Sequence, residues 1–218
     1  MKLFIDSANP KEIKAMWETD IIDGVTTNPS LAAKAGINYG KAVEEIIEIV
    51  DGDINLEVLA TETVGMVKEG RALAKLHNNI VVKIPITTDG LKALKILTEE
   101  GIRVNMTLVF SANQALLAAK LGAYIVSPFV GRLDDIGQSG IDLISEIQQI
   151  YRNYNFETQV LFASVRSPLH VKQAALAGCE IATVPFDVLQ KLAKHPLTDS
   201  GLKTFLADFE KSKQKQLV

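Results

Sequence analysis

The sequence has few of the residues that would build a disulfide, a metal centre or a membrane span. Its 218 residues include one cysteine, Cys179, which excludes an intramolecular disulfide and any site made from several cysteines. The three histidines, His77, His170 and His195, share no strand end and no ligand spacing, so we expect no metal ion. No segment approaches the roughly 18 apolar residues of a membrane span. With no apolar signal core after Met1, we expect a soluble, cytoplasmic protein.

The sequence also has little excess charge of either sign. Its 23 basic and 26 acidic residues give a net charge of −3, and basic residues cluster only in the short tail 211–215. Nucleic acid is therefore not an expected partner. Apolar residues make up 47% of the chain, which is enough for one large core. Because there is no linker and no repeat, we expect a single domain over 1–218, with 199–218 as a C-terminal helix and tail.

Short apolar runs alternate along the chain with segments whose apolar residues lie three and four positions apart. Segments of this helical period include 64–76, 91–97, 112–119 and 141–150, and plausible helix starts are Thr88-Asp89, Ser111 and Ser167-Pro168. An open doubly wound sheet would give a similar alternation. The count of eight strands and the absence of a Gly-x-Gly-x-x-Gly turn after the first favour a single (β/α)8 TIM barrel with an additional C-terminal helix. The candidate strands are Lys2–Asp6, Asp23–Thr26, Asn55–Leu59, Ile80–Lys83, Arg103–Thr107, Tyr124–Ser127, Gln159–Ala163 and Ile181–Val184.

One of these runs, Asn79-Ile80-Val81-Val82-Lys83, ends on a lone lysine. A continuous apolar run suits a strand buried on both faces, which would hold the Lys83 amine near the protein interior. Burial favours the neutral amine, the form that attacks a carbonyl to give a Schiff base. The alternative is a lysine that merely ends a strand and reaches solvent along its methylene stem. Taken alone, the run favours this alternative.

Polar side chains at the ends of the other candidate strands reverse that preference. In an eight-stranded barrel, the carboxyl ends of the strands surround one central point, where catalytic side chains lie. We therefore expect the strand-end polar groups to converge on a ligand. They are Asp6, Thr26-Thr27-Asn28, Glu57, Lys83, Asn105 with Thr107, Ser127, and Ser164 with Arg166.

Six ordered motifs carry a likeness to a known family: Phe4–Ala8, Gly24–Leu31, Val82–Pro85, Val104–Leu108, Ser127–Arg132 and Ala163–Arg166. With them the chain resembles the transaldolase family, in the short microbial branch that also contains fructose 6-phosphate aldolases. The resemblance implies a (β/α)8 barrel and Schiff-base aldol chemistry at Lys83, with no metal or organic cofactor. It also implies sugar phosphates as small-molecule ligands and a homo-oligomer, because short transaldolases resemble ring-forming decamers.

The resemblance assigns catalytic roles to four residues. Lys83 forms the Schiff base, and Asp6 exchanges the proton of the C4 hydroxyl. Glu57, with Thr107 and a water, removes water from the carbinolamine. The expected substrate-binding residues are Thr26, Asn28, Ser30, Asn105, Ser127, Phe129, Arg132, Ser164 and Arg166.

Some of these residues have simpler explanations. Asn28 precedes Pro29, so it has the alternative role of a helix cap. Arg132, Ser164 and Arg166 are expected to hold phosphate. A surface pair with Asp134 or Asp135 is an alternative for Arg132 and a weaker one for Arg166.

Two positions separate transaldolases from their aldolase relatives. Fructose 6-phosphate aldolases of this branch carry glutamine where this chain has Glu57 and tyrosine where it has Phe129. Both residues therefore predict a transaldolase of the pentose phosphate pathway, which moves a dihydroxyacetone unit between sugar phosphates. The donors are sedoheptulose 7-phosphate and fructose 6-phosphate, and the acceptors glyceraldehyde 3-phosphate and erythrose 4-phosphate. The alternatives are an aldolase that releases free dihydroxyacetone and, less favoured, a sugar-phosphate binding barrel without turnover.

Overall fold

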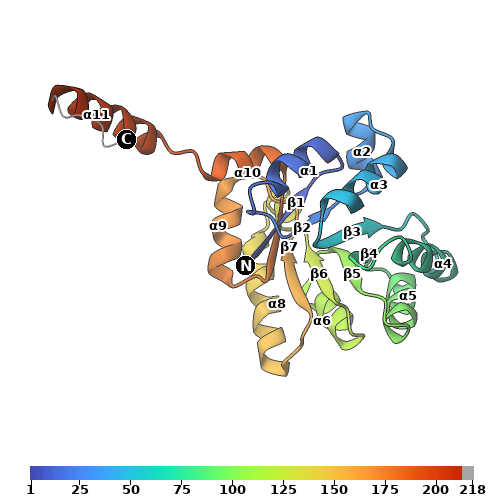
Figure 1. The fold of residues 1–218 in the computed structure, drawn as a ribbon. Helices are drawn as coiled ribbons and strands as arrows, with labels where there is room; N and C mark the ends of the chain where they lie inside the picture. The colour runs from blue at the N-terminus through green and yellow to red at the C-terminus, as the bar shows by residue number, and fades with distance from the viewer. Residues whose placement is uncertain (213–218) are drawn as a thin grey trace.

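The protein is described by a computed structural model in which residues 1–212 are placed. Parallel strands alternate with helices and close into a barrel in the order β1-β2-β3-β4-β5-β6-β7-β8 (Figure 1). The strands are β1 (Lys2–Asp6), β2 (Gly24–Thr26), β3 (Asp53–Glu57), β4 (Ile80–Pro85), β5 (Val104–Val109), β6 (Ile125–Pro128), β7 (Gln159–Phe162) and β8 (Ile181–Val184). The helices are α1 (Pro10–Trp17), α2 (Pro29–Ala35), α3 (Tyr39–Ile49), α4 (Thr63–Ala74), α5 (Thr88–Glu99), α6 (Ala112–Lys120), α7 (Val130–Asp134), α8 (Gly140–Tyr154), α9 (Pro168–Ala177), α10 (Phe186–Leu192) and α11 (Pro196–Ser212). The predicted (β/α)8 barrel with a C-terminal helix is therefore confirmed.

Several predicted boundaries are displaced by a few residues. Strand β3 begins at Asp53 and ends at Glu57, two residues before the predicted span, and the Leu59 amide beyond it donates to the Glu69 carboxylate of α4. Strand β4 continues two residues past Lys83, to Pro85. The cap of α5 is Thr87, whose hydroxyl accepts from the Gly90 amide, rather than the predicted Thr88-Asp89. Ser111 and Ser167 occupy the predicted N-cap positions; the Ser111 hydroxyl accepts from the Gln114 amide, whereas the Ser167 side chain makes no cap hydrogen bond.

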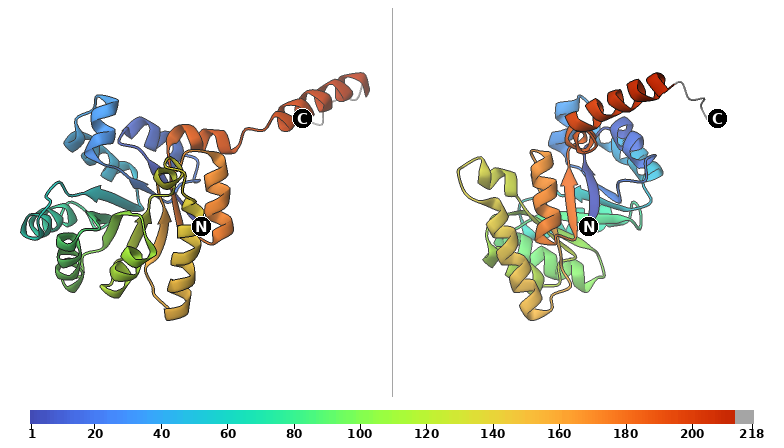
Figure 2. Two further views of the ribbon diagram at one scale, coloured as in Figure 1. Left: turned by 180° about the vertical axis from the view of Figure 1, so that it is seen from behind. Right: turned by 90° about the vertical axis from the view of Figure 1, so that its left-hand side faces the viewer.

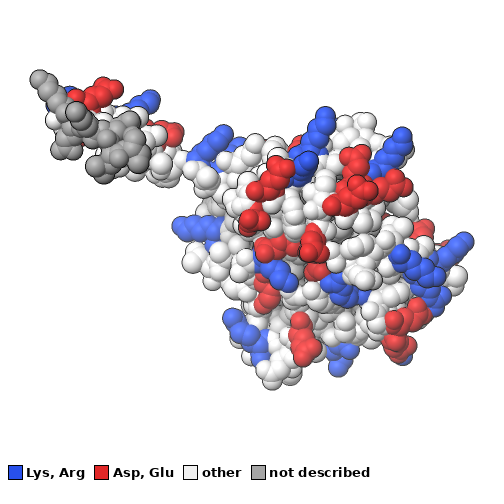
Figure 3. Space-filling view, in the orientation of Figure 1, with Lys and Arg blue, Asp and Glu red and all other residues white. Residues whose placement is uncertain are grey.

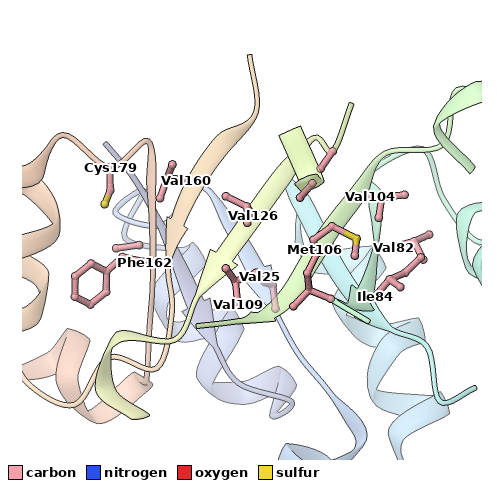
Figure 4. Close-up of a cluster of buried hydrophobic side chains, with 14 of the residues drawn as sticks. Val25, Val82, Ile84, Val104, Met106, Val109, Val126, Val160, Phe162 and Cys179 are labelled. Carbon is pink, nitrogen blue, oxygen red and sulfur yellow. The ribbon is translucent and has the colours of Figure 1, made fainter. Parts of the chain in front are cut away.

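Side chains alternate between the inside of the barrel and the layer beneath the helices. Val82 and Ile84 of β4 face the helices and belong to the larger core, part of which Figure 4 shows. The residue between them, Lys83, together with Val81, faces the barrel interior, because successive strand residues point to opposite sides. This alternation sends a charged side chain inward from an otherwise apolar strand.

The middle of the barrel interior is filled by a small apolar cluster around Phe4, which comprises Phe4, Val81, Ile125, Leu161, Ala163 and Ile181. The facing position on β2 is Gly24, where a Cβ would lie 2.7 Å from the Phe4 ring and 2.6 Å from the Asp53 carbonyl oxygen. Glycine at this position therefore makes room for the phenyl ring. The cluster forms a floor beneath the polar groups at the carboxyl ends of the strands.

Helix α11 extends away from the barrel (Figures 1 and 2). It begins at Pro196, three residues before the predicted start, and none of its residues is buried. Residues 213–218, the last part of the predicted C-terminal helix and tail, lie outside the described residues. In Figure 3, basic and acidic side chains are interspersed over the visible face of the barrel. Among residues 1–212, no helix has both the length and the apolar character needed to cross a bilayer.

Candidate active site

A cavity of about 450 Å³ lies at the carboxyl ends of the strands. Its volume is in the range of small-molecule sites. All of the predicted site residues line it except Asn105. The lining residues that were predicted are Asp6, Thr26, Asn28, Ser30, Glu57, Lys83, Thr107, Ser127, Phe129, Arg132, Ser164 and Arg166.

Lys83 extends into this cavity from β4. Its neighbours in the strand register are Glu57 of β3 and Asn105 of β5. Only 9% of the Lys83 side chain is exposed, and its Nζ lies 3.1 Å from Oε2 of Glu57, whose side chain is 24% exposed. The amine therefore does not reach bulk solvent along the strand. Among the described residues its one ion-pair partner is Glu57, and it faces a space large enough for a substrate.

Asp6 lies at the end of β1, opposite Thr26 in the register of β2. The Thr26 hydroxyl donates to Oδ1 of Asp6 at 2.7 Å. Burial raises the pKa of Asp6 above its ordinary value, although the nearby Lys83 ammonium and the Thr26 hydrogen bond act in the opposite direction. A raised pKa brings a carboxyl closer to the range in which it both accepts and returns a proton at physiological pH.

Thr183 of β8 is a cavity residue that the sequence analysis missed. The eighth strand was the only candidate without a recognised polar end. The Thr183 side chain is 4% exposed, and its hydroxyl oxygen lies 2.5 Å from that of Thr26. The sequence did contain a signal for Thr183: it lies two residues after Ile181 in the same strand, so both side chains point into the barrel.

Asn105 lies below the cavity in a buried chain of amides and hydroxyls. The Ser127 hydroxyl donates to Oδ1 of Asn105 at 2.7 Å, and Nδ2 of Asn105 donates to Oδ1 of Asn55 at 2.9 Å. Nδ2 of Asn55 in turn donates to the Val25 carbonyl at 3.1 Å. Asn105 is not among the residues that line the cavity, and Ser127 links it to the cavity, so its role in substrate binding stays a prediction. Asn55 was not predicted, although it occupies the inward position two residues before Glu57.

Asn28 combines both of the roles considered for it. It is the N-cap of α2, where Oδ1 accepts from the Leu31 amide at 2.9 Å. Its Nδ2 makes no hydrogen bond to the described residues and lies at a cavity wall. The cap fixes the side chain in one orientation, which leaves the amide nitrogen as a donor toward a ligand.

Besides Lys83, three basic residues line the cavity: Arg132, Arg166 and, unpredicted, Lys34 of α2. Nη2 of Arg166 lies 2.9 Å from Oδ2 of Asp135, and about half of each side chain is exposed. The guanidinium of Arg132 instead lies 4.8 Å from the centroid of the Phe129 ring. The surface pair considered for Arg132 is thus made by Arg166.

Phe129 is held by contacts on two sides. Its ring meets the Phe110 ring edge-on, with centroids 5.8 Å apart, and lies beneath the Arg132 guanidinium. Both contacts are favourable for an aromatic ring. They fix an apolar surface at the cavity wall.

Two cavity residues have a left-handed backbone, Leu108 with φ 59° and Ser164 with φ 62°. Leu108 lies where the register between β5 and β6 shifts, between Met106 and Val109. Such conformations cost free energy in residues other than glycine, and bulges beside functional sites redirect side chains. In this chain, Leu108 follows Thr107 and Ser164 lies two positions before Arg166, and both Thr107 and Arg166 line the cavity.

No group of three His, Cys, Asp or Glu side chains within residues 1–212 is arranged to hold a metal ion.

Comparison with known proteins finds relatives over nearly the whole chain. A family model described as Transaldolase/Fructose-6-phosphate aldolase matches residues 3–217. The chain is 59% identical over 216 residues to a probable transaldolase from Caldicellulosiruptor saccharolyticus, covering 99% of this chain and 100% of that protein. It is 59% identical to a probable transaldolase from Myxococcus xanthus over 97% of this chain and 95% of that protein. A probable transaldolase from Methanococcus maripaludis is 57% identical over 96% of this chain and 98% of its own length.

Proposed function

This chain belongs to the transaldolase/fructose-6-phosphate aldolase family, and on that premise we propose that it transfers a dihydroxyacetone unit through a Schiff base on Lys83. The donors are the ketose phosphates sedoheptulose 7-phosphate and fructose 6-phosphate. The acceptors are the aldose phosphates glyceraldehyde 3-phosphate and erythrose 4-phosphate. The reaction is proposed for the pentose phosphate pathway in the cytoplasm.

The observation that carries this proposal is the Lys83 amine, enclosed in a polar cavity beside one carboxylate. Its contact with Glu57 at 3.1 Å provides a group that can exchange protons with the amine and with the carbinolamine formed from it. A lysine that served only the fold would not need a cavity above it. The position supports nucleophilic attack on a bound ketone.

We propose the following steps for these groups. Lys83 adds to the C2 carbonyl of the ketose, and Glu57 with Thr107 supplies the proton that lets water leave, which gives the iminium. Asp6 then takes the proton of the C4 hydroxyl, the C3–C4 bond breaks, and its electron pair moves into the iminium to give an enamine. The aldose phosphate leaves. The enamine attacks the acceptor aldehyde, Asp6 returns the proton to the new hydroxyl, and hydrolysis of the second iminium frees Lys83.

The phosphate of either substrate is proposed to bind Arg132, Arg166 and the Ser164 hydroxyl, which line the cavity together. A guanidinium suits a dianion because it donates several hydrogen bonds in one plane. The ion pair between Arg166 and Asp135 is about half exposed and therefore weak. A phosphate could replace Asp135 beside the guanidinium, or bind it together with Asp135, at little cost in free energy.

Transfer, rather than release of dihydroxyacetone, is supported by Phe129. Its apolar ring supplies no hydroxyl to protonate the enamine or to orient water toward the iminium, so the covalent intermediate waits for an aldehyde. The ring's contacts with Phe110 and Arg132 keep it in place at the cavity wall.

A homo-oligomer, a decamer by family resemblance, is also proposed, and α11 supports it. The helix has no buried residue, and its apolar side chains Leu197, Phe205 and Leu206 are all more than half exposed. Apolar side chains gathered on a projecting helix indicate a protein interface. Light scattering of the full chain should give a multiple of the 23.7 kDa subunit mass, whereas the subunit mass itself would refute this part of the proposal.

An assay with and without an acceptor tests the proposed reaction. With fructose 6-phosphate and erythrose 4-phosphate, the enzyme should form sedoheptulose 7-phosphate and glyceraldehyde 3-phosphate, and prolonged EDTA treatment should leave the rate unchanged. With fructose 6-phosphate alone, little dihydroxyacetone should appear. Phe129→Tyr should raise this release relative to transfer, because the phenol can relay a proton. A parent enzyme that releases dihydroxyacetone as fast as it transfers it would favour the aldolase alternative.

A further inference from the structure

Three inward side chains from β1, β2 and β8 form a continuous row at one wall of the cavity. Oγ1 of Thr26 lies 2.7 Å from Oδ1 of Asp6 and 2.5 Å from Oγ1 of Thr183. Both threonines are buried, with 3% and 4% of their surfaces exposed. The row therefore joins the first and last strands of the barrel through the second.

The direction of these hydrogen bonds follows from counting hydrogens. Thr26 has one hydroxyl hydrogen, and it donates this hydrogen to Asp6. The short contact between the two hydroxyl oxygens then requires the hydrogen of Thr183. Both hydroxyl dipoles consequently point toward the carboxylate, and hydrogen bonds arranged in this way strengthen one another.

We propose that Thr183 is a positioning residue for the reaction: through Thr26 it fixes Asp6 by Oδ1 and stabilises its carboxylate, leaving Oδ2 for the reacting hydroxyl. This inference rests on the proposed function, in which Asp6 exchanges the C4 hydroxyl proton. Oδ2 of Asp6 makes no hydrogen bond to the described residues, whereas Asp6 itself lines the cavity. Because the proton is exchanged at Oδ2, the bond from Thr26 to Oδ1 persists in both protonation states.

Burial raises the pKa of Asp6, whereas the hydrogen bond from Thr26 lowers it. Burial and the Glu57 carboxylate both raise the pKa of Asp6, while Lys83, Thr26 and Arg166 lower it. A hydrogen bond to the charged form favours that form. Without the second hydroxyl, Thr26 would be a poorer donor and Asp6 would be protonated at a higher pH.

The test is the pH dependence of kcat/KM for fructose 6-phosphate at saturating erythrose 4-phosphate. Thr183→Val keeps the shape of the side chain but removes its hydroxyl. The acid limb should move about half a unit or more to higher pH, with the plateau above the limb retained within a few-fold. Thr183→Ser, which restores the hydroxyl, should restore the parent limb.

A double mutant shows whether Thr183 acts through Thr26. In a Thr26→Val background, Thr183→Val should produce no further shift of the acid limb, because the link to Asp6 is already cut. Equal shifts in both backgrounds, or an unchanged limb in Thr183→Val, would overturn the proposal. A lower plateau that Thr183→Ser fails to restore would also overturn it.

A measurement without turnover separates this inference from the proposed function. The carboxyl carbon of Asp6, labelled with ¹³C and assigned by its loss in Asp6→Asn, can be titrated directly in the full chain. Thr183→Val should raise the midpoint of that titration even if the parent proves inactive in the transfer assay. An unchanged midpoint would exclude the role given to Thr183, whatever the enzyme's activity.

Discussion

Two ion pairs at opposite ends of β3 have similar partners and different surroundings. At the start of the strand, Asp53 pairs with Arg103; at its end, Glu57 pairs with Lys83. Arg103 also donates to the Asn78 carbonyl at 2.9 Å and lies 5.2 Å from the centroid of the Tyr124 ring, whose hydroxyl donates to Asp53. Within residues 1–212, Lys83 makes one ion pair, with Glu57, and it faces a cavity.

The difference shows which charges serve the fold and which remain available for chemistry. A partly buried charge is stable when other donors and acceptors satisfy it, as they satisfy Asp53, whose side chain is 12% exposed, and Arg103, whose side chain is 33% exposed. Lys83 keeps unused hydrogen-bonding capacity beside an open space. In a (β/α)8 barrel, polar groups at the amino ends of the strands serve stability and those at the carboxyl ends serve catalysis, and β3 has one pair of each kind.

The largest effect is expected for Lys83→Met, which removes the proposed nucleophile. The transfer rate should fall by roughly 10⁴-fold or more, because loss of a covalent nucleophile leaves only binding and positioning. Thermal unfolding should shift less than in Arg103→Met, since Glu57 is partly exposed to the cavity and can be hydrated. A greater loss of stability than in Arg103→Met would show that the two pairs do not differ in this way.

Arg103→Met should have the opposite profile. It removes the guanidinium from Asp53, which keeps only the Tyr124 hydroxyl, and from the Asn78 carbonyl, so the free energy of unfolding should fall by about 1–3 kcal/mol. For a chain of this size, this corresponds to a Tm lowered by several degrees, which calorimetry can measure. Transfer activity at 25 °C should stay within a few-fold of the parent. A large loss of activity with an unchanged Tm would contradict the structural role.

Arg166→Ala tests a third, exposed pair. The Arg166–Asp135 contact is about half exposed, so its loss should barely change Tm. If Arg166 binds phosphate, kcat/KM for phosphorylated substrates should fall by about one to two decades, with little effect on unphosphorylated dihydroxyacetone and glyceraldehyde. Asp135→Asn is the matched control, because it removes the same pair and keeps the guanidinium. Equal losses on both substrate sets would assign Arg166 to the fold.

The smallest effect is expected for the thermal stability of Asp6→Asn. Burial raises its pKa in the folded state, so between the ordinary value and the raised one the folded chain binds more protons than the unfolded chain. The free energy of unfolding contributed by this group therefore falls as pH rises through that window. Asp6→Asn should have a higher Tm than the parent at neutral pH, and the difference should vanish at pH values below the window. A mutant that is less stable at neutral pH would show that Asp6 stabilises the fold.

The alternation of apolar runs with helical segments predicted an α/β protein, because buried parallel strands read as apolar runs, and the count of eight strands with no Gly-x-Gly-x-x-Gly turn favoured the barrel over an open sheet. The six motifs predicted the family, which the comparisons confirm. The polar strand ends also predicted most of the cavity wall. These features are local in sequence and depend little on the exact register.

The features that were missed depend on which way single side chains point. Thr183 is an ordinary strand residue in composition, and its role follows from register with β1 and contact with Thr26. Asn55 was missed, and it accepts a hydrogen bond from the predicted residue Asn105; neither lines the cavity, and the strand-end pattern does not specify how deep an inward side chain lies. Asp135 pairs with Arg166, and at Gly131 a Cβ would lie 2.0 Å from the Ser164 carbonyl oxygen and 2.9 Å from Cγ of Arg166, a close approach that the strand ends do not indicate.

The central claim is that Lys83 carries the dihydroxyacetone unit, and chemical trapping tests it most directly. The enzyme is treated with fructose 6-phosphate and borohydride, which reduces the iminium to a stable amine, and is then digested for mass spectrometry. One reduced dihydroxyacetone unit on Lys83, absent from every other lysine and absent in Lys83→Met, is the predicted result. An adduct on another lysine, or no adduct in an enzyme that transfers, would contradict the account.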